Sequence, residues 1–139
     1  MQQAIEEALK ADPNKVYPNP LVGCVIVKND KIIGRGYHKK FATNHAEVNA
    51  IESLETPVKN ADLYVTLEPC AMCAALIANA RIRRIYFAAS DPKSGGIQQG
   101  ARVFDHKQTH HVPEIYSGIG EEKAVKLLRN FFATKRMKL

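Results

Sequence analysis

The feature that most limits how this chain can fold is a short helix that lacks a polar face. Residues 71–80 read AMCAALIANA, and a helix this apolar must be buried on most of its sides. Two runs typical of β-strands flank it, DLYVTL at 62–67 and RRIYFAA at 83–89. A buried helix between two strands predicts an α/β protein in which helices pack on a sheet.

The rest of the chain supplies further strands and helices for such a sheet. LVGCVIVK at 21–28 and KIIGRGYH at 31–38 flank an Asn-Asp turn and predict a β-hairpin, and VPEIYSG at 112–118 predicts a last strand. Helices are predicted over 2–10, 45–55 and 121–139, with an extended proline-rich loop over 13–20. This order predicts a three-layer α/β/α sandwich around a mixed five-stranded sheet. Since no repeat or linker interrupts the chain, we expect a single domain over 1–139.

Composition and charge restrict the cellular setting and the partners. No apolar run approaches the roughly 20 residues that span a bilayer, and MQQAIEEALKADP at the N-terminus has no signal-peptide pattern. We therefore expect a cytoplasmic protein without a membrane partner. The formal net charge of +6 suits an anionic partner such as RNA or a phosphorylated metabolite.

Two of the three cysteines are spaced as metal ligands. Cys70 and Cys73 form a CxxC motif on the first turn of the apolar helix, which brings both sulfurs to one side. The positive end of the helix dipole favours their thiolate forms. Taken alone, CxxC is also typical of a thioredoxin-like redox pair or of half a structural zinc site. The third cysteine, Cys24, lies within a predicted strand and is expected to be a core residue.

His45 supplies a third candidate ligand, and Glu47 follows it two residues later. The sequence contains no second CxxC and no CxxH that would complete a four-ligand structural site. Three protein ligands and one open position are typical of a catalytic zinc ion, which lowers the pKa of its water to about 7. Glu47 is the candidate that moves protons between this water and a leaving amine. His-x-Glu followed by Pro-Cys-x-x-Cys is the signature of zinc nucleobase deaminases.

With these motifs and with LYVTLEPCAMCAALIANARIRRIYFAASDPKSG, the chain resembles the cytidine/deoxycytidylate deaminase superfamily over nearly its whole length. The resemblance implies an α/β/α fold and a homodimer. It also implies that His45, Cys70 and Cys73 bind Zn²⁺ and that Glu47 is the proton shuttle. Met72, Leu76 and Ile77 on the apolar helix are candidates for the dimer interface.

The two halves of the chain resemble different branches of this superfamily. The second half is similar to bacterial tRNA-specific adenosine deaminases, including paired Phe residues and basic residues in the last helix. PNPLVGCVIVKNDKIIGRGYH followed by NHAEV is instead similar to the pyrimidine deaminase domain of the bifunctional riboflavin-pathway enzyme. That enzyme carries an insertion between its two zinc cysteines, where this chain has a plain CxxC.

The favoured function is a zinc-dependent hydrolase of the C–N bonds of cyclic amidines that deaminates adenosine in tRNA to inosine. One alternative is the deamination of a small free substrate, namely a cytosine- or guanine-type base, a nucleoside, a nucleotide or a riboflavin-pathway pyrimidine. Another is a non-catalytic zinc-binding subunit that binds RNA or a partner, although such a subunit would not need Glu47. Asn19 and His38 are predicted to bind the substrate, and Lys135 and Arg136 are candidate nucleic-acid contacts.

Overall fold

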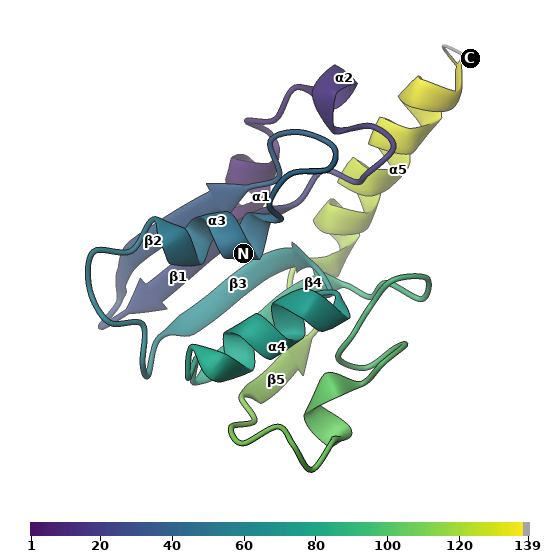
Figure 1. The fold of residues 1–139 in the computed structure, drawn as a ribbon. Helices are drawn as coiled ribbons and strands as arrows, with labels where there is room; N and C mark the ends of the chain where they lie inside the picture. The colour runs from purple at the N-terminus through teal and green to yellow at the C-terminus, as the bar shows by residue number, and fades with distance from the viewer. Residues whose placement is uncertain (138–139) are drawn as a thin grey trace.

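The computed structural model describes residues 1–137 of the chain. A five-stranded sheet with the strand order β2-β1-β3-β4-β5 forms its centre (Figure 1). The strands are β1 (Gly23–Lys28), β2 (Lys31–Tyr37), β3 (Asp62–Leu67), β4 (Arg84–Ala89) and β5 (Glu114–Ser117). The helices are α1 (Gln2–Ala8), α2 (Pro13–Val16), α3 (Ala46–Glu52), α4 (Ala71–Asn79) and α5 (Glu121–Met137), with a 3₁₀ turn η1 (Val103–Asp105).

The sheet is mixed, as the sequence predicts. β1 pairs with β2 and with β3 in antiparallel fashion, whereas β3, β4 and β5 run parallel to one another. The turn of the β1–β2 hairpin lies at Asn29 and Asp30, whose φ angles of 52° and 62° match the tight turns that such hairpins favour. Helices α3 and α4 cover one face, and α1 and α5 pack on the other (Figure 1). The predicted three-layer α/β/α sandwich is therefore confirmed.

The sequence predicts an extended proline-rich loop after α1, but this segment contains the single turn of α2. Asp12 precedes this turn, and its side chain accepts a hydrogen bond from the backbone N–H of Asn14. Pro13 occupies the first helical position, where a missing N–H costs nothing. A side-chain cap followed by a proline is therefore sufficient to start a short helix here.

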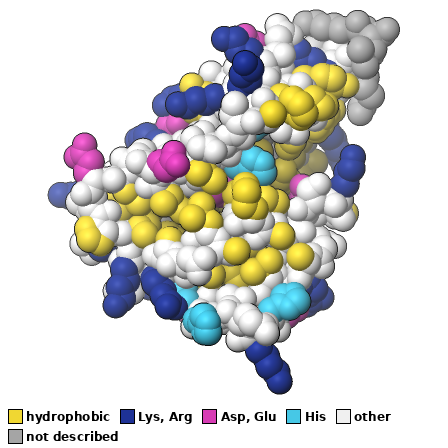
Figure 2. Space-filling view, viewed as in Figure 1, with side chains coloured by type: hydrophobic (Ala, Val, Ile, Leu, Met, Phe, Trp, Pro, Cys, Tyr) yellow, Lys and Arg dark blue, Asp and Glu magenta, His cyan; other side chains and the backbone are white. Residues whose placement is uncertain are grey.

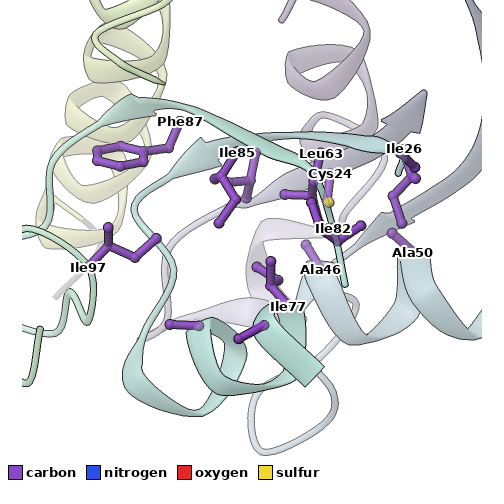
Figure 3. Packing of buried hydrophobic residues seen from close by; sticks show 14 of the residues in the cluster. Cys24, Ile26, Ala46, Ala50, Leu63, Ile77, Ile82, Ile85, Phe87 and Ile97 are labelled. Atoms are coloured by element: carbon purple, nitrogen blue, oxygen red, sulfur yellow. The ribbon is translucent and has the colours of Figure 1, made fainter. Parts of the chain in front are cut away.

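The main hydrophobic core lies between the sheet and the two helices α3 and α4. Leu63 and Ile85 of the sheet lie across from Ile77 of α4, and Phe87 lies beside Ile97 in the same core (Figure 3). Cys24 is fully buried in the same core, as the sequence predicts. Small side chains on both helices allow them to approach the sheet closely.

Glycine in β2 sets the distance between the sheet and α3. A Cβ atom on Gly36 would lie 2.3 Å from the backbone nitrogen of Ala50 and 2.5 Å from the carbonyl oxygen of Ala46. Only a residue without a side chain allows this approach. The start of α3 is thereby held against the sheet, close to the point where α4 begins.

Candidate metal centre

His45 and Cys70 each lie directly before the first turn of a helix, His45 before α3 and Cys70 before α4, and Cys73 lies within the first turns of α4. The ligand atoms of these three residues all lie within 4.8 Å of one another. The Nδ1 atom of His45 is 3.5 Å from the sulfur of Cys70 and 3.6 Å from the sulfur of Cys73. A tetrahedral zinc ion with ordinary Zn–S and Zn–N bonds separates sulfur and nitrogen ligands by about 3.5 Å. The donor set therefore fits zinc in both chemistry and spacing.

The protonation of the cysteines also prepares this site for a cation. A hydrogen bond from the Cys73 thiol, aided by His45, lowers the pKa of Cys70 to about 4. The same hydrogen bond to Cys70 raises the pKa of Cys73, and the contact with Cys70 raises the pKa of His45. One sulfur is thus a thiolate at neutral pH, and a thiolate is the form of cysteine that binds metals.

Glu47 lies on the first turn of α3, and only 4% of its surface is exposed. Burial is the main cause that raises the pKa of its carboxyl group to about 7. A carboxyl group with such a pKa can both accept and donate a proton near neutral pH.

The metal-binding residues open into a cavity of about 170 Å³. Glu47 lines it together with His45 and Cys70, and so do Asn19 and His38, which the sequence analysis proposed as substrate-binding residues. All five residues therefore face one space, although they come from four separate stretches of the chain. Cys73 belongs to the metal site but does not line this cavity.

Asn19 and His38 form a hydrogen-bonded pair at the wall of the cavity. The ring of His38 is buried, and its Nδ1 atom lies 3.0 Å from the carbonyl oxygen of Asn44. Because a carbonyl only accepts, Nδ1 carries the proton, and Nε2 is free to accept from the amide nitrogen of Asn19 at 3.1 Å. The tautomer of His38 thus sets the orientation of the Asn19 amide.

Three further polar residues line the cavity and were missed in the sequence analysis: Glu68, Asp91 and Ser94. Asp91 and Ser94 belong to the glycine-rich loop that follows β4, where Asp91 Oδ1 accepts hydrogen bonds from the N–H groups of Lys93 and Ser94. The available signal was the position of this loop directly after a buried strand. Glu68 stands next to the Pro-Cys-x-x-Cys motif.

Of the two candidate nucleic-acid contacts at the end of α5, Lys135 and Arg136, the structure describes the side chain of Lys135. Lys135 is buried, and its ammonium group donates a hydrogen bond to Asn14 Oδ1. A buried ammonium group that donates within the chain does not fit the role of a nucleic-acid contact that the sequence suggested for Lys135. The side chain of Arg136 lies outside the described residues.

The candidate interface residues on α4 divide into two groups. Met72 is 57% exposed, and hydrophobic side chains gather on this face of the molecule (Figure 2). Leu76 is partly exposed. Ile77 is fully buried in the core of its own chain, so its proposed place in an interface is wrong. Within residues 1–137, no helix has the length and apolar character to cross a membrane.

Comparison with known proteins agrees with this geometry. Residues 1–89 match the model of the cytidine and deoxycytidylate deaminase zinc-binding region. The chain is 41% identical to a tRNA-specific adenosine deaminase of Agrobacterium fabrum, over 99% of this chain and 94% of that protein. It is also 36% identical to the riboflavin biosynthesis protein RibD of Bacillus amyloliquefaciens, over 94% of this chain but 36% of that protein. A structure from a study of A-to-I editing by tRNA:A34 deaminases superposes with a TM-score of 0.78, at 38% identity and covering 92% of this chain and 97% of the other.

Proposed function

The chain belongs to the cytidine and deoxycytidylate deaminase family, and we propose that it converts adenosine in tRNA to inosine with a zinc ion held by His45, Cys70 and Cys73. The observation that carries this proposal is that three metal ligands cluster together, and that two of them and the buried Glu47 carboxyl group line one cavity. Similarity to tRNA-specific adenosine deaminases over nearly the full length of both chains supports adenosine as the substrate.

A bound zinc ion supplies a polarised water whose pKa is lowered to about 7. When zinc is bound, Glu47 would accept a proton from such a water, and the water would add to the carbon that bears the amine. Glu47 then delivers protons to the neighbouring ring nitrogen and to the leaving amine. The net reaction consumes one water and releases ammonia, leaving a carbonyl group on the base. The pKa of about 7 suits Glu47 to both proton transfers.

A base inside a double helix cannot reach such a cavity, so the substrate nucleotide must be unpaired and turned outward. We propose that the pair of Asn19 and His38 recognises the base once it enters. With its amide nitrogen turned toward His38, Asn19 directs Oδ1 as an acceptor toward an N–H group of the base. His38 is too buried to be a broad contact surface and acts through Asn19.

A second candidate substrate is a small pyrimidine of the riboflavin pathway. It is favoured by the similarity to RibD and by the presence of the motifs that carry Asn19 and His38. The plain CxxC spacing of Cys70 and Cys73 favours the first candidate.

We further propose that the protein is a homodimer that acts in the cytoplasm on tRNA. The exposed side chain of Met72 on the hydrophobic surface of α4 supports an interface at that helix (Figure 2). Burial of apolar surface is the main favourable term in such an association.

The test is a substrate panel scored by ammonia release and by inosine formation. The panel holds an anticodon stem-loop with an unpaired adenosine, the same stem-loop with guanosine in its place, and free cytosine, guanine and diaminopyrimidine compounds. We expect inosine from the first RNA alone, and its formation should be at least about a hundredfold slower with Glu47→Gln. Ammonia from a free base or nucleotide but not from RNA would replace the tRNA assignment with the small-substrate one. A zinc-loaded protein inactive on the whole panel would contradict both.

A further inference from the structure

Glu68 is a buried carboxylate that the proposed chemistry does not use. It follows β3 directly, and only 3% of its surface is exposed. Its Oε1 atom accepts a hydrogen bond from the backbone N–H of Asp91 at 3.1 Å. Its Oε2 atom accepts three more, from the N–H groups of Ile97, Gln98 and Gln99 at 3.1, 2.8 and 3.0 Å.

These four donors belong to one irregular loop, residues 91–99, that follows β4. The loop has neither helix nor strand to pair its backbone groups. A buried N–H without an acceptor loses its hydrogen bonds to water without replacement, and hydrogen bonds to a charged acceptor are stronger than those to a neutral one. The Glu68 carboxylate therefore replaces regular secondary structure as the element that fixes this loop.

Backbone contacts bring the same loop onto the start of α4. The N–H of Gly96 donates to the carbonyl oxygen of Pro69 at 2.8 Å. A Cβ atom on Gly96 would lie 2.4 Å from the backbone nitrogen of Ala71, and one on Gly95 would lie 2.6 Å from the carboxyl carbon of Glu68. The two glycines thus let the loop lie directly against Glu68 and the start of α4, which carries the cysteine ligands.

The loop forms part of the wall shared by two spaces, together with Asn19, Pro20 and Leu67. Asp91 and Ser94 line the metal cavity, and both also line an adjoining groove of about 380 Å³. Leu128 and Phe132 of α5 also line this groove. A substrate larger than one base would have to pass along this wall when its reacting base occupies the cavity.

We propose that Glu68 is a positioning residue that holds loop 91–99 as the wall shared by the metal cavity and the groove, and that it thereby sets substrate affinity. Its carboxylate fixes Asp91 at one end of the loop and the 97–99 segment at the other. The inference rests on the proposed function. It adds loop 91–99 to the proposed active site as the segment that contacts the part of the substrate beyond the reacting base.

Glutamine at this position separates the charge from the side-chain shape. An amide has one acceptor oxygen, so if that oxygen keeps the three bonds of Oε2, the amide NH₂ faces the N–H of Asp91. One hydrogen bond is lost and two donors are brought together. If loop 91–99 then adopts the conformation described here only about one tenth of the time, the apparent affinity for the substrate falls about tenfold.

The experiment compares Glu68→Gln with Glu55→Gln, which makes the same chemical change on an exposed residue that lines neither the metal cavity nor the groove. Zinc content, hydrogen exchange of the peptide over 91–99, and kcat and KM on the stem-loop RNA are measured on the zinc-loaded proteins. For Glu68→Gln we expect one zinc per chain, faster exchange confined to this peptide, and KM raised about tenfold with kcat within about threefold. Glu55→Gln should match the unchanged protein.

Asp91→Ala provides a second variant that weakens the loop without changing the buried carboxylate, and it is informative even if Glu68→Gln fails to fold. It should reproduce the rise in KM. Wild-type exchange and wild-type KM in Glu68→Gln would overturn the proposal, as would loss of zinc with a fall in kcat, since Glu68 would then support the metal centre only. Failure of the proposed function has a different signature, namely no inosine from the unchanged protein. Faster loop exchange in Glu68→Gln would still be measurable in that case, and KM would be measured on whichever compound of the panel reacts.

Discussion

The Nδ1 atom of His45 lies 3.5 Å from the sulfur of Cys70, although the two residues are 25 positions apart in the sequence. Each residue immediately precedes a helix and has an extended backbone, with φ near −70° in both. Two helices that begin at the same edge of the sheet therefore each contribute a ligand from the same structural position. The positive ends of both helix dipoles also point toward this site, which favours anionic ligands there.

Removal of the metal should destabilise the protein, because a ligand that binds only the folded state stabilises it by an amount that grows with the logarithm of its free concentration relative to Kd. At a free zinc concentration about a thousandfold above Kd, the gain is about 4 kcal/mol. We expect dialysis against a chelator to lower Tm and re-addition of one equivalent of zinc to restore it. Thermal unfolding with metal analysis measures both.

The cysteines provide the control for that experiment. Cys73→Ala should abolish stoichiometric zinc binding, whereas Cys24→Ala should retain one zinc per chain because Cys24 is buried in the core and is not part of the ligand cluster. A Cys24→Ala protein that folds but loses its zinc would contradict the three-residue ligand set.

Glu47→Gln should leave the metal in place and stop the reaction. The amide keeps the size of the side chain but cannot carry protons, so kcat should fall by about 10²- to 10⁴-fold. Zinc content should be unchanged, because Glu47 is not part of the ligand cluster. Glu52→Gln, on the exposed side of the same helix, is the matched control and should retain full activity. Residual activity of Glu47→Gln close to that of the control would exclude Glu47 as the proton shuttle.

The sequence predicts those features of the structure that depend on residues close together in the chain. Alternation in DLYVTL predicts a strand, and the structure buries Leu63 and Val65 while Tyr64 faces the other side of the sheet. The Asn29-Asp30 pair predicts the hairpin turn for a similarly local reason. The metal ligands were also predictable, because the spacing of CxxC and His-x-Glu places them at helix starts.

The features that sequence could not predict depend on contacts between distant, irregular segments. The Glu68 carboxylate reaches N–H groups 23 to 31 positions away in a loop without any periodic pattern. Lys135 has the appearance of a solvated charge at the end of an amphipathic helix, yet it pairs with Asn14, 121 positions earlier. Both contacts exist only because the fold brings chain segments together that have no local reason to meet.

The pairing of Asn19 with His38 predicts that their substitutions are not additive. Asn19→Ala removes the base contact, and His38→Ala leaves the Asn19 amide free to rotate, so each should raise KM. Because His38 acts through Asn19, the double variant should be little worse than Asn19→Ala alone. The coupling free energy from a double-mutant cycle on KM should lie within about 0.5–3 kcal/mol. Additive effects would show that the two side chains bind the substrate independently.

The surface of α4 predicts opposite outcomes for two neighbouring apolar residues. Met72 is exposed in the single chain, so Met72→Lys should leave folding intact, and it should turn a homodimer into monomers by placing a charge in an apolar interface. Ile77 fills the core, so Ile77→Ala should cost about 2–5 kcal/mol of folding free energy through loss of apolar contacts and the cavity that remains. Sedimentation equilibrium reports the first effect, and denaturant unfolding at fixed protein concentration reports the second. If Met72→Lys sediments as the unchanged protein does while remaining folded, the dimer does not form through this part of α4.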